Sequence, residues 1–245
     1  SVAPRSLNFL VGEVYTGPGS WGIDVIRYYL GPDGLDSVFD FPLMWSLREA
    51  VAHESVGMAA IEATLRDVEA KTAGSGATMA RMVGNHDTTR FLSEAAGGTA
   101  ADPWASPEPQ PQEALAYERQ ALALGLVLTL PGLPVIYYGD EVGLAGGHDP
   151  DCRRVMPRWG ALAQPQAGWL ETTRRLGRLR RCSPALRTGA RTAVVTEDDV
   201  YAFVRAPAEG PAALVIASRA GEARSVVVPG LALKPGAYRD ALTGE

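Results

Sequence analysis

The order of apolar runs and helical segments is the feature that most restricts the fold of this chain. Four short apolar runs lie at residues 7–11, 35–41, 78–83 and 133–138. Segments of helical period follow them at 23–30, 43–71 (with a break near Gly57), 113–129 and 169–181. This alternation is typical of parallel βαβ units, in which helices cover the sheet. It fits an open four-stranded sheet or half of an eight-stranded βα barrel.

From about residue 190 the pattern changes. Short β-rich runs lie at 193–195, 200–204, 213–217 and 225–228, with turns and no helical segment between them. Such spacing predicts a small antiparallel domain after the βα units. Between them, residues 93–112 are polar and rich in Ala, Pro and Gly, which predicts a long loop.

Composition excludes several classes of protein. The chain is 46% hydrophobic and 21% charged with a net charge of −5, so it is globular and has no electrostatic preference for nucleic acid or an anionic membrane. It lacks a run of about 18 apolar residues, so no membrane span is expected. Cys152 and Cys182 are expected to be free thiols, and no metal ligand set or cofactor is predicted. The compartment stays open, with the cytoplasm slightly favoured.

Acidic residues lie where three of the predicted strands should end. Glu13 comes after Phe9–Gly12, and burial there would favour the protonated form that a general acid needs. Gly84 is followed by Asn85, His86 and Asp87, which supply a donor, a titratable ring and a carboxylate. The third is the pair Asp140 and Glu141. Ligands of α/β folds bind at the carboxyl ends of parallel strands, so these residues predict a site there.

A second motif points to a different chemistry. Residues 17–22 satisfy the G-x-G-x-x-G pattern of dinucleotide-binding proteins, and Asp40 lies about 20 residues further on. The motif does not begin in a tight strand-to-helix turn, however, and Trp21 would crowd a pyrophosphate. We therefore favour a structural role for these glycines.

Taken in order, these motifs resemble those of the α-amylase family of glycoside hydrolases (family 13). Gly12-Glu13-Val14 is similar to the fifth-strand motif that carries the proton donor, and Asn85-His86-Asp87 to the seventh-strand motif. Residues 134–141 resemble the eighth strand, residues 146–154 the loop after it, and residues 179–186 the passage to the C-terminal domain. Residues 149–156 resemble most the neopullulanase, cyclomaltodextrinase and maltogenic amylase members.

The resemblance implies roles for six residues. Glu13 would be the general acid and later the base, and Asp87 would bind sugar hydroxyls and stabilise the oxocarbenium-like transition state. Asn85 and His86 would support the same subsite, and Asp149 and Arg153 would bind a neighbouring glucose unit. The partner would be an α-glucan. Asp140 and Glu141 are expected at most to organise their loop, and Trp21 to stack on sugar or to pack.

One part of the family pattern is missing. The nucleophilic aspartate of the family follows an arginine by two residues on the fourth strand, and residues 2–8 are too short for that strand and contain no Asp. We therefore expect an α/β fold that is the second half of a (β/α)8 TIM barrel, strands five to eight, over residues 1–188. An antiparallel β-sandwich domain would follow over 189–245, interrupted near Leu242.

The function expected is that of a retaining hydrolase of α-glucosidic bonds, represented by a fragment that lacks the nucleophile and is inactive alone. Two alternatives stay open. One is an α-glucan transglycosylase or sucrose-acting relative, because these motifs do not decide between water and sugar as acceptor. The other is a non-catalytic amylase-like binding or partner subunit, which the presence of Glu13 and Asp87 disfavours.

Overall fold

Four short parallel strands form the centre of the N-terminal part. The computed structural model describes residues 9–98, 102, 104–223, 225–228, 238–242 and 244. The strands are β1 (Val11–Gly12), β2 (Ser37–Val38), β3 (Ala80–Arg81) and β4 (Leu133–Pro134). β1 pairs with β2 and β3 with β4, and a parallel bridge between Phe39 and Ala80 joins the two pairs. The strands thus follow one another in space as they do along the chain.

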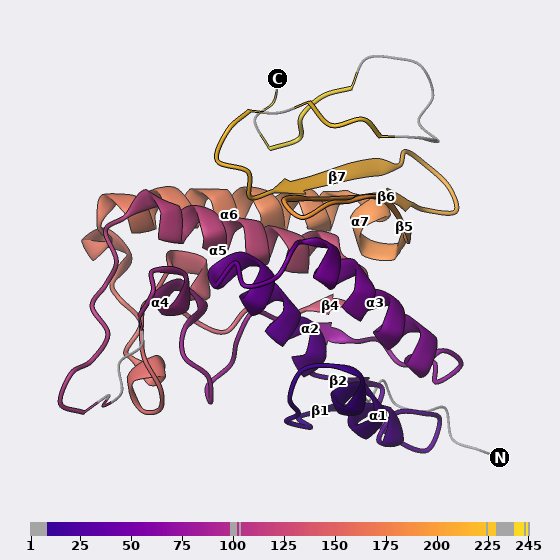
Figure 1. The fold of residues 1–245 in the computed structure, drawn as a ribbon, viewed down its shortest axis with the longest axis horizontal. Helices are drawn as coiled ribbons and strands as arrows, with labels where there is room; N and C mark the ends of the chain where they lie inside the picture. The colour runs from indigo at the N-terminus through magenta and orange to yellow at the C-terminus, as the bar shows by residue number, and fades with distance from the viewer. Residues whose placement is uncertain are drawn as a thin grey trace.

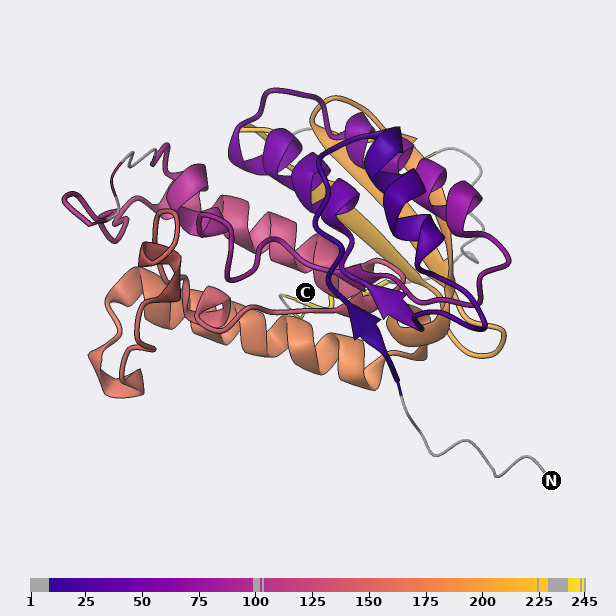
Figure 2. The same ribbon diagram turned by 90° about the horizontal axis from the view of Figure 1, so that it is seen from below.

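Helices separate the strands and form a layer beside them (Figures 1 and 2). They are α1 (Ser20–Tyr28), α2 (Phe41–Leu47), α3 (Ala59–Thr72), α4 (Phe91–Ala95), α5 (Ala114–Thr129), α6 (Gln164–Cys182) and α7 (Pro184–Thr188). A π-helical turn (Arg48–Ala52) extends α2, and 3-10 turns lie at Asp140–Val142, Asp151–Arg153 and Trp159–Ala161. None of the helices in the described ranges is long and apolar enough to cross a bilayer.

The helix boundaries differ from the sequence prediction at several places. Helices α1 and α6 begin at Ser20 and Gln164, before the predicted residues 23 and 169. Helix α2 begins at Phe41, inside the predicted strand 35–41, because Asp40 accepts a hydrogen bond from the Leu43 amide (3.1 Å) and caps the helix. Helix α4 lies at the edge of the predicted loop 93–112. The break near Gly57 is confirmed, because the π-helical turn ends at Ala52 and α3 begins only at Ala59. A Cβ on Gly57 would lie 2.6 Å from the Asp198 carboxylate, so this segment packs closely.

The C-terminal residues form a three-stranded antiparallel sheet, β5 (Ala190–Thr196), β6 (Val200–Ala206) and β7 (Ala213–Ser218), with β6 in the middle. Residues 225–228, predicted as a fourth strand, are not in a strand, although Val226 and Val228 pack on the outer face of the sheet. Residues 1–8, Thr243 and Glu245 lie outside the described residues. Two residues of the run 7–11, Leu7 and Asn8, and part of the predicted interruption near Leu242 are therefore not described.

The sheet and the helix layer share one hydrophobic core. Tyr201 and Phe203 of β6 pack among the buried side chains of α2, α3 and α5, and Figure 1 shows the sheet lying over the helices, away from β1–β4. Between the two parts, the Tyr201 hydroxyl donates to Glu62 (2.7 Å), and Arg191 pairs with Glu62 and Glu69. The last helix ends at Thr188 and β5 begins at Ala190. The division into domains at 1–188 and 189–245 stays a prediction.

The two outermost parallel strands leave apolar side chains exposed. Phe9, Leu10 and Val11 are exposed at β1, and Leu133, Ile136 and Tyr138 at or after β4. In the described part of the chain, each of these strands has one neighbouring strand. An exposed apolar strand edge is unusual in a finished fold and marks a surface that another segment could cover.

Candidate active site

Glu13 and Asn85 join the ends of β1 and β3. Glu13 is the first residue after β1, and its Oε1 accepts a hydrogen bond from Asn85 Nδ2 at 2.8 Å. Asn85 is buried, and its Oδ1 accepts from the Asp87 amide (3.0 Å), which fixes the side-chain orientation. The Glu13 side chain remains 34% exposed, so the desolvation expected from the preceding apolar run is only partial.

His86 and Asp87 complete the cluster. His86 Nε2 lies 3.5 Å from Asp87 Oδ2 and 4.0 Å from Glu13 Oε2. A carboxylate oxygen of Glu13, a ring nitrogen of His86 and a carboxylate oxygen of Asp87 all lie within 4.8 Å of one another. Exposed acidic groups at this spacing are common without an ion, so this set alone is no evidence for a cation. The two carboxylates therefore face a common space beside the imidazole.

Arg153 ties the loop after β4 to this cluster. Its Nη2 lies 2.9 Å from Asp87 Oδ1, its Nε lies 3.0 Å from Asp149 Oδ1, and its Nε also donates to the His86 carbonyl (2.9 Å). All six residues singled out from the sequence are thus brought together. The side chains of Asp87, Asp149 and Arg153 are all about half exposed, so a ligand from solvent could reach them.

A layer of buried arginines supports the cluster from beneath. Arg48 donates to the carbonyls of Val83 (2.9 Å) and Thr89 (2.8 Å) and pairs with Glu94 (2.5 Å). Gly84 is required beside it, because a Cβ at that position would lie 2.6 Å from Arg48 Nη2. Arg48 was not predicted as a site residue, since an arginine inside an amphipathic segment usually lies at the surface.

Arg90 connects the cluster to the loop after β4. It donates to the carbonyls of Cys152 (2.8 Å) and Tyr138 (2.5 Å) and pairs with Asp140 Oδ1 (3.1 Å). Its guanidinium lies over the Tyr137 ring, 4.0 Å from the centroid. This residue was also missed, although its place three residues after Asp87 was a signal that could have drawn attention to it.

Asp140 and Glu141 organise their own loop, as expected from the sequence. Burial raises the pKa of Asp140 to about 6, and the neighbouring Arg90 opposes the shift. Glu141 Oε2 accepts from the Gly139 amide (2.6 Å). Neither carboxylate takes part in the contacts among Glu13, His86 and Asp87.

Cys152 lies directly under His86. Its Sγ donates to the His86 carbonyl (3.1 Å), and burial raises the pKa of the thiol. Both Cys152 and Cys182 are unpaired, as predicted. The carbonyl of His86 thus accepts from two consecutive residues, Cys152 and Arg153, which holds the segment 85–87 in place.

The G-x-G-x-x-G segment does not form a tight turn between strand and helix. β1 ends at Gly12, five residues before the motif, and α1 begins only at Ser20. A Cβ on Gly22 would lie 2.4 Å from the Gly17 carbonyl, so that glycine serves close packing. Trp21 is 69% exposed, so it does not pack in the core, which was one of the two roles expected for it.

Comparison with known proteins identifies the class of this domain. Residues 4–194 match the catalytic domain of α-amylases, which defines the class as a glycosidase-type catalytic domain. The chain belongs to the α-amylase family of glycoside hydrolases, family 13. The family resemblance predicted from the sequence motifs is therefore confirmed.

Two curated relatives are similar over different lengths. The chain is 30% identical to neopullulanase 2 of Thermoactinomyces vulgaris over 249 aligned residues, 98% of this chain and 37% of the relative. It is 32% identical to the cyclomaltodextrinase of Thermoanaerobacter pseudethanolicus over 60% of this chain and 21% of that enzyme.

A solved structure resembles the fold. The cyclic α-maltosyl-(1→6)-maltose hydrolase of Arthrobacter globiformis, in complex with maltose, superposes with a TM-score of 0.68 at 29% identity, covering 86% of this chain and 41% of the hydrolase. The structural neighbours are TIM-barrel amylases. The chain spans less than half the length of each of these three proteins.

Proposed function

We propose that this chain supplies the acid–base part of a retaining hydrolase of α-glucosidic bonds in α-glucans such as maltodextrin, cyclodextrin or pullulan. In this proposal, β1 to β4 are strands five to eight of a (β/α)8 barrel, and β5 to β7 begin a C-terminal sandwich. The observation that carries it is the cluster of Glu13, Asn85, His86 and Asp87 at the ends of β1 and β3. The names of the relatives, cyclomaltodextrinase and neopullulanase, support the substrate class.

Glu13 would protonate the glycosidic oxygen and later activate water. The amide of Asn85 holds one carboxyl oxygen and leaves Oε2 free to face the sugar, a geometry that suits directed proton transfer. Asp87 would accept hydrogen bonds from sugar hydroxyls and stabilise positive charge on the ring. Its ion pair with Arg153 (2.9 Å) fixes the orientation of the Asp87 side chain beside the sugar.

Two other residues extend the site beyond the point of cleavage. Asp149 and Arg153 lie on the loop after β4, next to Asp87, and their half-exposed groups match the hydroxyls of an adjoining glucose unit. His86 would add a donor to the same sugar ring as Asp87. A glucan would therefore run from Glu13 along the loop that carries Arg153.

The chain has no assigned nucleophile in this scheme. Retaining enzymes need a second carboxylate about 5 Å from the acid. Carboxylate oxygens of Glu13 and Asp87 lie within 4.8 Å of each other, so distance alone would allow Asp87 to be the nucleophile. The family resemblance, however, assigns the nucleophile to an aspartate two residues after an arginine, and no Arg-x-Asp triplet occurs in the sequence. We propose that this aspartate comes from a further protein segment and that the isolated chain does not turn over glucan.

The test compares two forms of the protein. The purified chain should release no reducing sugar from maltotriose or β-cyclodextrin. A longer active protein that contains this segment should lose about 10²–10⁴-fold in kcat when Glu13 is replaced by Gln, while Glu141→Gln, a matched control outside the cluster, should keep most of the activity. Turnover by the chain that Glu13→Gln leaves unchanged would refute both parts of the proposal.

A further inference from the structure

The π-helical turn after α2 is bonded to the C-terminal sheet. This turn, Arg48–Ala52, has a geometry that is rare in proteins and occurs frequently at functional sites. Arg219, the first residue after β7, donates through Nη1 to the carbonyls of Ala50 (2.6 Å) and Val56 (2.7 Å). These contacts join residues that lie 169 and 163 positions apart in the sequence.

The end of the turn needs such a donor. The last carbonyls of a helix lack partners within the helix, and a cation beside them is favourable. The chain leaves the turn through Glu54, whose φ of 52° lies in the left-handed region that residues other than glycine rarely adopt. The Arg219 side chain is only 13% exposed, and its Nε also pairs with Asp199 (3.1 Å). A buried charged group of the C-terminal part thus fixes a strained exit from the helix.

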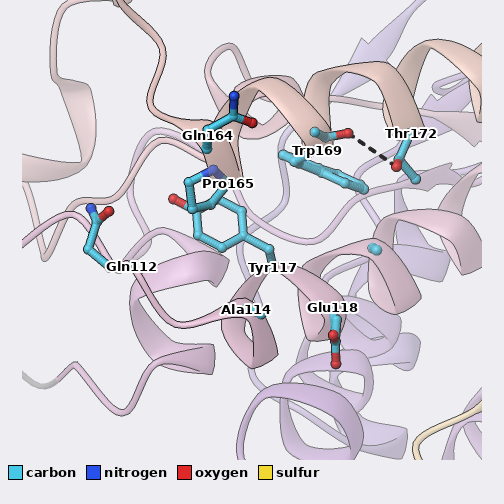
Figure 3. Close-up of a pocket in the computed structure, with 10 residues that line it drawn as sticks. Gln112, Ala114, Tyr117, Glu118, Gln164, Pro165, Trp169 and Thr172 are labelled. Atoms are coloured by element: carbon cyan, nitrogen blue, oxygen red, sulfur yellow. Dashed lines mark hydrogen bonds between the residues drawn. The ribbon is translucent and has the colours of Figure 1, made fainter.

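Helix α5 supplies a second contact with the same turn. Arg119 of α5 donates through Nη2 to Glu54 Oε1 (2.7 Å) and through Nη1 to the Ala95 carbonyl of α4 (2.8 Å). Figure 3 shows Tyr117 of α5 and Trp169 of α6 at a pocket of about 310 Å³ between these two helices. Both side chains are buried, so α5 is packed firmly on α6 and forms a fixed support for the turn.

Arg48 connects the turn to the candidate active site. Its Nη2 donates to Thr88 Oγ1 (3.1 Å), and the same oxygen accepts from the Asn85 amide (3.1 Å). Asn85 is the residue that orients Glu13. Arg48, Thr88 and Asn85 are each at most 5% exposed. Buried hydrogen bonds and two residues of helical backbone therefore join Arg219 to Glu13.

We propose that Arg219 is a positioning residue: through the π-helical turn and Arg48, it holds residues 84–89 in the geometry that orients Glu13. Arg219 itself contacts none of the six residues of the candidate active site. Accuracy at Glu13 matters, because an error of about 1 Å at a catalytic group can cost about 100-fold in rate. The effect on rate rests on the proposed function, whereas the structural coupling does not.

Hydrogen exchange of the purified full chain tests the coupling. Arg219→Met removes the donors and keeps the apolar stem of the side chain. Peptides that cover residues 48–56 and 83–90 should exchange about tenfold faster, while those of α6 should be unchanged. Tyr201→Phe is the matched control, because it removes a buried hydrogen bond to Glu62 between the same sheet and α3. It should leave residues 83–90 unchanged.

Three results would overturn the proposal. They are unchanged exchange of residues 83–90 in Arg219→Met, an equal effect of Tyr201→Phe on these residues, and faster exchange throughout α5 and α6, which indicates lower global stability. Arg219→Lys keeps a charged donor and should restore part of the protection. If Arg219→Met does not fold, Arg219→Lys is compared with Tyr201→Phe by the same criteria.

Kinetics in a longer active protein that contains this segment tests the effect on rate. Arg219→Met should lower kcat roughly 2–30-fold, with a smaller change in KM, and Arg219→Lys should recover part of the loss. An unchanged kcat would overturn the positioning role of Arg219. Hydrolysis that Glu13→Gln leaves unchanged would instead refute the proposed function, and the exchange result would stand.

Discussion

Asn85 Nδ2 donates to Glu13 Oε1 at 2.8 Å, across 72 residues of sequence. The bond connects the ends of two strands that are not neighbours, since β2 lies between β1 and β3. It orients a partly exposed carboxylate by a buried amide, and the amide is fixed in turn by the Asp87 backbone. The position of Glu13 therefore depends on the turn that follows β3.

Replacing Asn85 by Ala should misplace Glu13 without unfolding the protein. Hydrogen bonds to charged groups contribute about 1.5–3 kcal/mol, so kcat in a longer active protein should fall roughly 10–100-fold, with a smaller change in KM. Steady-state kinetics on maltotriose checks this. Gln112→Ala, an exposed amide away from the cluster, is the control, and an equal loss there would contradict the argument.

Arg90 should be needed for folding stability. Removing one member of a buried ion pair costs about 3–5 kcal/mol, and Arg90 also holds the carbonyls of Cys152 and Tyr138. We expect Arg90→Leu to lower the free energy of unfolding, measured with urea, by an amount in that range. Arg175→Leu, on the exposed face of α6, should change it by less than about 0.5 kcal/mol.

Two aspartates should give opposite pH dependences of stability. Because Asp140 has a raised pKa of about 6, the folded state binds more protons than the unfolded state between pH 3.8 and 6. Its contribution to the free energy of unfolding therefore falls as pH rises through that window, by about 3 kcal/mol at most. Urea titrations from pH 4 to 7 should show a slope that Asp140→Asn removes. An unchanged slope in that variant would contradict the assignment.

The pKa of Asp151 shifts the other way. Burial acts to raise it, but hydrogen bonds from Arg154 and from the amides of Gly147 and Glu108 outweigh burial and lower it. Its stabilising effect is thus present above the unfolded value of 3.8 and is lost as pH falls through the lower folded value. Asp151→Asn should be less stable than the original chain at pH 7, and the difference should shrink in acid unfolding curves.

The two thiols should differ in reactivity. Cys152 is buried with a raised pKa, and Cys182 is exposed. Iodoacetamide at pH 8 should modify Cys182 in the folded chain and reach Cys152 only in denaturant, because the thiolate is the nucleophile. Mass spectrometry of the digested protein distinguishes the two. Equal labelling under native conditions would show that the segment under His86 opens readily.

The sequence predicts the strand-end cluster but not its support. Glu13 and Asp87 come shortly after the apolar runs 7–11 and 78–83, so a parallel sheet must bring their positions to one edge. Arg48 and Arg90 gain their roles through carbonyls and carboxylates far along the chain, and no local pattern encodes those partners. The regular strands are also shorter than the apolar runs, because such runs report burial and not the length of the hydrogen-bonded ladder.

Among the described residues, β1 has a neighbouring strand on one side only, and this has a consequence for handling the protein. The exposed hydrophobic side chains of Phe9, Leu10 and Val11 lie at this strand edge. An extended peptide could pair with such an edge as an additional strand. At high concentration, copies of the chain should therefore adhere to one another through this rim. Lower protein concentration, or an added strand that pairs with β1, should each reduce this self-association.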